Sequence, residues 1–260
     1  MELSGGTSSV YKKGNKIYRK QRENSKTVQK LLVHLKNKGF NKAPEFLGTE
    51  GEYEVLSFVK GECFEPEEYP FTNDVEHRLE IIRKAARLLR EFHDSTTDFE
   101  IEEADKWWLT YKGELPKEVI CHNDFATYNV TFVNGLPYGI IDFDTCTTAP
   151  RIWDIAYGVY RFVPLGEMQY DADLKAERKY NDSDRNFRQK GIKAFFESYG
   201  MEMADDFCEV IKERLMAMAN IITDEAQKGN EAFEKMIDEG HYDFYLNEIK
   251  FIDKHFNEWI

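Results

Sequence analysis

The sequence has few cysteines and no long apolar run, and both absences narrow the class of protein. Its four cysteines stand far apart and show no metal-ligand spacing, so neither a disulfide framework nor a zinc site is expected. No apolar run approaches the roughly 20 residues that a membrane-spanning helix needs. The first residues, MELSGG, also lack the basic-then-apolar pattern of a signal peptide. We therefore expect a reduced, cytoplasmic protein with no membrane partner.

Outside the first 60 positions, basic residues are far fewer than acidic ones. Residues 1–60 carry 12 Lys or Arg against 6 Asp or Glu, whereas the remainder carries 23 against 42, and the formal net charge is −13. An acidic body argues against a nucleic-acid partner and favours a cationic one, while a basic front segment suits a polyphosphate. Solubility alone explains the same asymmetry equally well.

Three side chains that can handle metals or protons stand at fixed intervals in the middle of the chain. Asp124 and Asn129 follow a short apolar strand, and Asp142 comes after two further apolar runs, 130–133 and 136–141. An Asn-Gly pair joins those runs, and it is the strongest short hairpin signal. The hairpin should fold Asp142 back towards Asp124 and Asn129. A carboxylate and a carboxamide that converge in this way suit Mg²⁺, which prefers oxygen ligands and shares them with substrate phosphates.

The same stretch carries a resemblance to a known family. His122-x-Asp124-x4-Asn129, followed by Asp142-Phe143, resembles the catalytic segment of the aminoglycoside phosphotransferase family, whose members are small-molecule relatives of the protein kinases. Protein kinases place a Lys two residues after the catalytic Asp, where this chain has an alanine. That difference favours the small-molecule branch.

The resemblance implies an α+β, protein-kinase-like two-lobed fold. A small antiparallel-sheet amino lobe, residues 1–59, would bind the nucleotide. A larger and mostly helical carboxy lobe, residues 60–260, would carry the catalytic residues and bind the acceptor. ATP, with GTP left open, and Mg²⁺ are the cofactors that the resemblance implies.

It also assigns roles to individual residues. Asp124 would be the catalytic base, and Asn129 and Asp142 would be the metal ligands. His122 would brace the catalytic loop. Asp154, in an Asp-Ile-Ala sequence that is another family trait, would hold the same loop through hydrogen bonds.

One strand of the amino lobe should carry a cation for the α- and β-phosphates. Because strand side chains alternate between faces, Arg19 shares a face with an apolar residue two positions earlier, and we prefer it. Lys20 is the alternative, since the wider family usually has Lys. Kinase-like folds commonly pair this cation with a Glu from the next helix, but residues 25–39 contain none. Gln29 is the nearest polar candidate there.

Two further nucleotide contacts are expected from the resemblance. The backbone of Ser57, Phe58 and Val59, at the end of a strand, would reach the base. A turn at residues 5–9, which contains two glycines and three hydroxyl residues, could lay its N–H groups over the phosphates, although the same residues also fit an ordinary turn.

We expect an ATP-dependent phosphotransferase that moves the γ-phosphate to a hydroxyl of a small molecule, either cationic and aminoglycoside-like or a metabolite. A protein kinase is disfavoured by Ala126 and by the short segment between Asp142 and Pro150, which leaves no room for an activation loop. The alternative is a non-catalytic nucleotide-binding or immunity-type module with a kinase-like fold. The missing helix Glu and the Arg at position 19 support that alternative.

Overall fold

The computed structural model describes residues 2–3, 10–69 and 71–260. The turn expected at residues 5–9 to cover the phosphates therefore lies outside the described residues.

The chain divides into two compact units, and each consists of two segments of sequence. Unit 1 comprises Met1–Cys63 and Arg87–Asp154, and unit 2 comprises Phe64–Ala86 and Ile155–Ile260. This division reflects contacts within the chain and not what each part binds. The boundary between residues 59 and 60, expected to separate nucleotide from acceptor binding, stays a prediction.

Unit 1 contains a five-stranded antiparallel sheet. The strand order is β1 (Glu2–Leu3), β2 (Val10–Lys13), β3 (Lys16–Lys20), β5 (Tyr53–Ser57) and β4 (Phe46–Glu50). The two central strands, β3 and β5, pair so that Arg19 stands directly opposite Glu54. An acid and a base at directly opposed positions can pair across the sheet.

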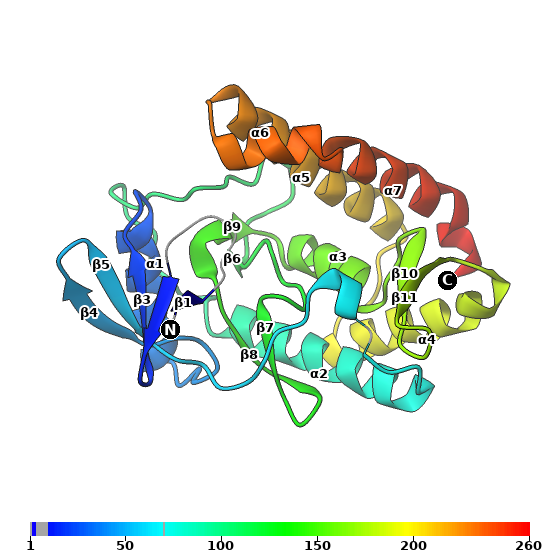
Figure 1. Cartoon of the computed structure of the whole chain (residues 1–260), viewed down its shortest axis with the longest axis horizontal. Helices are drawn as coiled ribbons and strands as arrows, with labels where there is room; N and C mark the ends of the chain where they lie inside the picture. The colour runs from blue at the N-terminus through cyan, green and yellow to red at the C-terminus, as the bar shows by residue number, and fades with distance from the viewer. Residues whose placement is uncertain (1, 4–9, 70) are drawn as a thin grey trace. The chain divides into compact units, whose positions relative to one another are not determined.

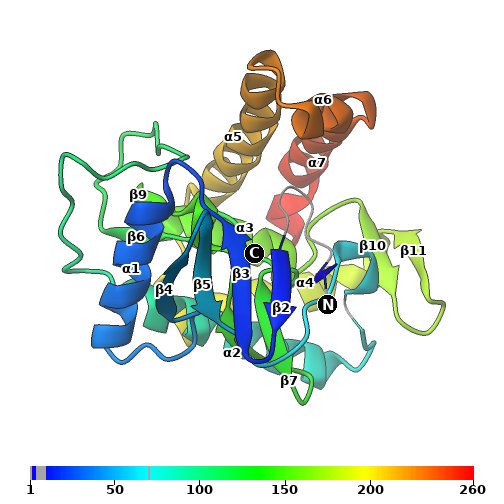
Figure 2. The ribbon, with the colours of Figure 1, turned by 60° about the vertical axis from the view of Figure 1, so that its left-hand side comes forward.

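Helix α1 (Ser25–Asn37) lies beside this sheet (Figure 2). Its apolar residues recur at helical spacing and bury Val28, Leu31, Leu32 and Leu35, which is the face expected of an amphipathic helix. Asn24 occupies the N-cap position, and its side chain is directed at the backbone of residue 144.

Unit 1 also contains two two-stranded antiparallel sheets. β6 (Val119–Cys121) pairs with β9 (Thr147–Ala149), and β7 (Val130–Val133) pairs with β8 (Leu136–Ile140). Asn134 and Gly135 join β7 to β8, and both have positive φ, 53° and 74°. The hairpin predicted from the Asn-Gly pair is present.

Backbone hydrogen bonds from the segment before β4 and the segment after β5 hold the β7–β8 hairpin. Glu62 exchanges two backbone hydrogen bonds with Phe132, at 3.1 and 2.7 Å, and the amide of Ile140 donates to the carbonyl of Lys42 at 2.7 Å. Glycines permit this close approach. A Cβ on Gly61 would lie 2.6 Å from the Phe132 carbonyl oxygen, and one on Gly139 would lie 2.8 Å from the Lys42 carbonyl oxygen.

Unit 2 is mostly helical. Its regular elements, two of which begin or end in unit 1, are α2 (Val75–Asp94), α3 (Arg151–Phe162), β10 (Met168–Asp171), β11 (Ala176–Lys179), α4 (Asp182–Tyr199), α5 (Phe207–Gln227), α6 (Glu231–Asp238) and α7 (His241–His255). Helix α5 packs against both α6 and α7 (Figure 1). Aromatic side chains dominate the core, and Phe195, Phe207 and Trp259 are fully buried.

Local sequence explains where these helices stop. Gly200 ends α4 with φ of 79°, a conformation that glycine adopts without the penalty a Cβ would bring.

None of the described helices combines the length and the apolar character needed to cross a membrane. The small antiparallel sheet and the largely helical remainder agree with the α+β architecture that the sequence predicts.

Candidate active site

Asp124 lies in the loop between β6 and β7, and both of its carboxylate oxygens are held. Asn129 donates from Nδ2 to Oδ2 at 2.8 Å, and the same nitrogen donates to the Asp124 carbonyl at 3.0 Å. The hydroxyl of Tyr128 donates to Oδ1 at 2.6 Å. The loop therefore fixes the orientation of a half-buried carboxylate, and two of the three residues predicted to act together are in direct contact.

The hairpin returns Asp142 to the same neighbourhood. The amide of Ile141 donates to the carbonyl of Asn129 at 2.8 Å, so Asp142 follows immediately after a residue bonded to Asn129. Asp142 has φ of 61° and ψ of 69°, a left-handed conformation that costs a non-glycine residue about 1–3 kcal/mol and clusters at functional sites. Its side chain is 55% exposed, unlike those of its neighbours Phe143 and Asp144.

His122 connects the loop to the end of the hairpin. Its Nε2 lies 2.9 Å from the carbonyl oxygen of Ile141, and its Nδ1 accepts from the amide of Asp124 at 3.3 Å. This pair of contacts corresponds to a neutral ring that carries its proton on Nε2. The ring also packs edge-on against Phe143, with 5.2 Å between centroids. These contacts would brace the segments that carry Asp124 and Asp142.

Asp154, at the beginning of α3, holds the other side of the loop. Its Oδ2 accepts from the amide of His122 at 2.5 Å and lies 3.1 Å from Nε2 of His93, while its Oδ1 accepts from the amide of Asn123 at 2.8 Å. Burial would raise the pKa of this carboxyl, but the hydrogen bonds from His93 and from the backbone of His122 outweigh burial and hold the pKa below its usual range. Asp154 is thus a fully buried anion whose hydrogen bonds fix the loop.

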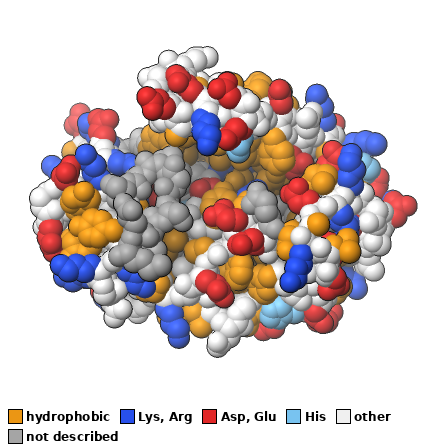
Figure 3. All heavy atoms as spheres, viewed as in Figure 1, with side chains coloured by type: hydrophobic (Ala, Val, Ile, Leu, Met, Phe, Trp, Pro, Cys, Tyr) orange, Lys and Arg blue, Asp and Glu red, His pale blue; other side chains and the backbone are white. Residues whose placement is uncertain are grey.

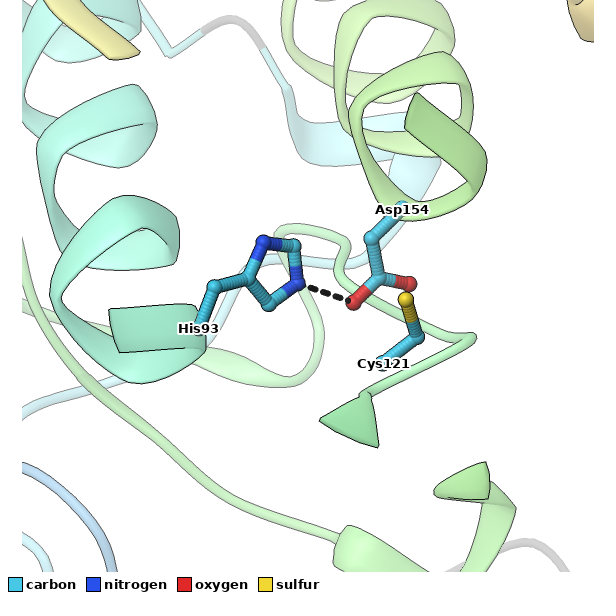
Figure 4. Close-up of side chains that lie close together, drawn as sticks. All are labelled: His93, Cys121 and Asp154. Atoms are coloured by element: carbon cyan, nitrogen blue, oxygen red, sulfur yellow. Dashed lines mark hydrogen bonds and ion pairs between the residues drawn. The ribbon is translucent and has the colours of Figure 1, made fainter. Parts of the chain in front are cut away.

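His93, Cys121 and Asp154 form a buried group that resembles a metal site (Figure 4). Their potential ligand atoms lie within 4.8 Å of one another, and His93 comes from the end of α2. The atoms already have other partners, however. Asp154 accepts three hydrogen bonds, and Sγ of Cys121 is 3.4 Å from the carbonyl of Pro150. Burial also keeps the pKa of His93 low, and the donor atoms are satisfied without an ion.

Arg19 brings three carboxylates together around one guanidinium. Its Nε lies 2.7 Å from Oε1 of Glu54, its Nη1 3.1 Å from Oδ1 of Asp142, and its Nη2 2.8 Å from Oδ1 of Asp144. Arg19 is only 8% exposed. Burial would lower its pKa, but Asp144, Glu54 and Asp142 together raise it. The predicted phosphate cation therefore contacts the predicted metal ligand Asp142.

Lys20, the alternative cation, lies at the surface. It pairs with Glu52 at 2.9 Å, and both side chains are 59% exposed. The alternation of side chains along β3 explains why Arg19 and Lys20 face opposite ways. The geometry accordingly favours Arg19.

Asp144 is buried between two arginines. Arg19 contacts its Oδ1, and Arg22 contacts its Oδ2 at 3.1 Å. Burial raises the pKa of Asp144, with a further increase from the charge of Asp142. Asp142 is exposed, whereas both oxygens of Asp144 contact arginines, so Asp142 is the more accessible carboxylate of the two. Its role as a metal ligand stays a prediction.

The segment predicted to meet the base has part of its backbone occupied. The amide of Ser57 donates to the carbonyl of Glu45 and the amide of Phe58 donates to that of Asn15, both at 2.9 Å. Contacts of Ser57 and Phe58 with a base would have to use their carbonyl oxygens. Val59 packs close to Gly139 of the hairpin.

Asn129 and Asp142 offer oxygen donors that suit Mg²⁺. Asn129 directs its Nδ2 at Asp124, so Oδ1 is its available ligand atom. Arg19 contacts only Oδ1 of Asp142, and the exposure of this side chain leaves Oδ2 accessible. The chemistry of the donor set therefore fits the ion that the sequence predicts.

Three residues of the site were not assigned from the sequence. The sequence alone places Tyr128 in the loop that carries Asp124, Arg22 in the basic front segment and Glu54 in a mostly apolar run. A signal was present for Glu54, because a lone acid inside the run Tyr-Glu-Val-Leu is rarely buried without a partner. Tyr128 and Arg22 carry no comparable signal.

Comparison with known proteins is consistent with this geometry. A model of the phosphotransferase enzyme family (APH) matches residues 94–187. The trifolitoxin immunity protein of Rhizobium leguminosarum bv. trifolii is 30% identical over 202 residues, which cover 76% of this chain and 72% of that protein.

The fold is similar to those of solved phosphotransferases. The streptomycin–ATP ternary complex of APH(2")-IIa matches with a TM-score of 0.55 and 16% identity, over 91% of this chain and 88% of that one. Macrolide 2'-phosphotransferase MphH from Brachybacterium faecium matches with a TM-score of 0.55 and 13% identity, over 90% of this chain and 91% of that one. The protein-kinase-like fold that the sequence predicts, with a small antiparallel-sheet lobe and a larger, mostly helical lobe, is thereby confirmed. The chain belongs to the aminoglycoside phosphotransferase (APH) family of phosphotransferase enzymes.

Proposed function

We propose that the protein transfers the γ-phosphate of ATP to a hydroxyl group of a small molecule. The observation that carries this proposal is the carboxylate of Asp124, which Tyr128 and Asn129 fix in one orientation next to the returning hairpin. A base held in this way suits phosphoryl transfer, where catalysis is mostly positioning and electrostatic stabilisation.

In the proposed reaction, the acceptor oxygen forms a bond to the γ-phosphorus, and the bond from that phosphorus to the bridging oxygen breaks, so that ADP leaves. The proton of the acceptor hydroxyl passes to the Asp124 carboxylate. Each oxygen of an ionised carboxylate has two lone pairs. Asp124 can therefore accept this proton while it still accepts hydrogen bonds from Tyr128 and Asn129.

The phosphates would be held by Arg19 and by a bound metal ion. Its guanidinium would contact the α- and β-phosphates, and Asn129 and Asp142 would hold Mg²⁺. When bound, the ion neutralises charge on the phosphates. Support for ATP comes from the solved relative that binds ATP together with streptomycin, and GTP remains the alternative nucleotide.

A cationic acceptor agrees with the charge of the carboxy-terminal helices. Exposed acids line α6 and the beginning of α7, namely Glu231, Glu234, Asp238, Glu239 and Asp243. Figure 3 shows acidic side chains gathered on the upper part of the face in view. Negative potential of this kind raises the local concentration of a cationic substrate.

Asp124→Asn tests the assignment directly. The variant keeps the size of the side chain but removes the base, so we expect kcat to fall by about 10²- to 10⁴-fold, while the Kd for Mg·ATP changes little. ADP release would be measured against a panel of aminoglycosides, choline, amino sugars and macrolides.

Asp98→Asn is the matched control, because Asp98 is an exposed acid of the same unit that pairs with Lys38, and it should turn over normally. Full turnover by Asp124→Asn would overturn the role of Asp124.

A second candidate is a nucleotide-binding immunity module without transferase activity. The curated relative named as an immunity protein favours it, as does the absence of a Glu in α1. Binding of Mg·ATP by the wild-type protein without ADP release from any acceptor in the panel would favour this candidate over the phosphotransferase.

A further inference from the structure

Glu54 is a buried acid in the middle of the sheet, and both of its oxygens have partners. Its side chain is 0% exposed. Oε1 accepts from Nε of Arg19 at 2.7 Å, and Oε2 accepts from Nε2 of Gln29 at 2.9 Å. Glu54 thus joins β5 to β3 and to α1 through one carboxylate.

Burying the Glu54–Arg19 ion pair costs free energy that a purely structural position would avoid. Removing a carboxylate and a guanidinium from water carries a desolvation penalty that their mutual attraction often fails to offset. An apolar pair would stabilise the sheet at least as well at these positions. A buried ion pair next to a candidate site is therefore a reason to look for a functional role.

The geometry indicates what that role is. A guanidinium is planar and rigid, so fixing Nε in one direction also fixes the plane in which Nη1 and Nη2 lie. Glu54 holds Nε. The two remaining nitrogens are then directed at Asp142 and Asp144, the segment that follows the β7–β8 hairpin.

We propose that Glu54, itself held by Gln29, is a positioning residue that fixes the Arg19 guanidinium for contact with the phosphates of the nucleotide. This inference rests on the proposed function for the identity of the ligand. It assigns to a strand residue the task of orienting the cation.

Glu54→Gln tests the proposal, because it keeps the shape but removes the charge and one of the two acceptor contacts. We expect the Kd for Mg·ADP, measured by titration calorimetry, to rise by about tenfold or more, because an Arg19 guanidinium that is no longer held in place would lose a charge-assisted contact with a phosphate. In turnover, the KM for ATP should rise while the KM for the acceptor stays unchanged. Glu52→Gln is the control, because Glu52 is exposed and pairs with Lys20, and it should leave both quantities unchanged.

A double-mutant cycle separates positioning from general stability. If Glu54 acts through Arg19, then Glu54→Gln should weaken Mg·ADP binding in the wild-type background but have almost no further effect in Arg19→Met. Equal losses in both backgrounds, or a Glu54→Gln variant with wild-type Kd, would overturn the proposal.

The two proposals fail separately. Absence of ADP release from every acceptor would overturn the phosphotransferase. The dependence of Mg·ADP binding on Glu54 could still be measured in that case, and its presence would uphold the positioning role. Conversely, normal transfer with unchanged Kd and KM in Glu54→Gln would leave the phosphotransferase intact and remove Glu54 from it.

Discussion

Gly61 and Gly48 are two glycines with almost the same backbone conformation in different surroundings. Their φ angles are 124° and 126°, in a region that side chains other than hydrogen rarely adopt. A Cβ on Gly61 would meet the backbone of Phe132, whereas one on Gly48 would meet nothing within 4 Å. The comparison separates backbone strain from close packing, because only Gly61 lies against the hairpin that leads to Asp142.

Gly61→Ala should therefore destabilise the protein more than Gly48→Ala. We expect backbone strain to lower the free energy of unfolding of both variants. In Gly61→Ala it should fall by about 1–3 kcal/mol more, because the added methyl group forces the hairpin away. The free energy of unfolding in urea is the measurement. Equal decreases in the free energy of unfolding of the two variants would mean that the hairpin accommodates the added methyl group without a loss of stability, which would contradict this expectation.

Residues of the site differ in how far the sequence could predict them. Asp124, Asn129 and the return of Asp142 follow from a motif and a turn signal, both of which are local. A lone acid in an apolar run signals that Glu54 has a partner, but the identity of that partner depends on the register of β3 against β5, which no local pattern specifies. Tyr128 was missed because a loop residue gives no indication of its hydrogen-bond partner.

Helix α3 contributes a single side chain, Asp154, that organises a loop far from it in sequence. The carboxylate accepts from two consecutive amides, those of His122 and Asn123, and from the ring of His93. Asn123 has φ of 63°, so one of the amides belongs to a strained residue. The loop that carries Asp124 therefore depends on α3 for its conformation.

Asp154→Ala should unfold the protein at much lower urea concentration. Removing the carboxylate leaves buried donors without an acceptor, and we expect a loss of about 3–5 kcal/mol, the range for breaking a buried charged network. Asp94→Ala is the control. Asp94 pairs with Arg90 and Arg151 at a half-exposed site, so its loss should cost about 0–1 kcal/mol. Similar costs for both variants would contradict this account of the loop.

Element boundaries were harder to predict than element types. Strand β5 ends at Ser57, opposite Lys16, where its partner β3 begins. The amide of Phe58 makes one further hydrogen bond in the same register, to the carbonyl of Asn15. Helix α1 begins at Ser25, and Asn24 takes the N-cap position, where its side chain donates to the carbonyl of Asp144. Both ends are decided by tertiary partners, which alternation and helical periodicity do not reveal.

At the scale of the whole molecule, the fold could be predicted because one motif in the middle of the chain identified the family. Composition and periodicity alone would have given only an α+β protein with an acidic body. The division into compact units could not be foreseen, because each unit combines two separate segments of sequence. The order of the elements along the sequence does not indicate that successive segments belong alternately to the two units.

Two helices contain residues of both units. The boundary between units falls after Ala86, inside α2, and after Asp154, inside α3. Helices form cooperatively, and short helical pieces are marginal in water. Loss of one unit would therefore remove support from part of a helix that belongs to the other.

We expect the two units to unfold in a single transition. Native-state hydrogen exchange would follow the amides of β5 in unit 1 and of α7 in unit 2, in the wild type and in Asp154→Ala. Although Asp154 belongs to unit 1, its substitution should lower the free energy of exchange equally at both sets of amides. Asp253→Ala, which removes an exposed partner of Lys212 on α7, should change neither set by more than about 1 kcal/mol. Wild-type protection of α7 in Asp154→Ala would instead establish that unit 2 is stable by itself.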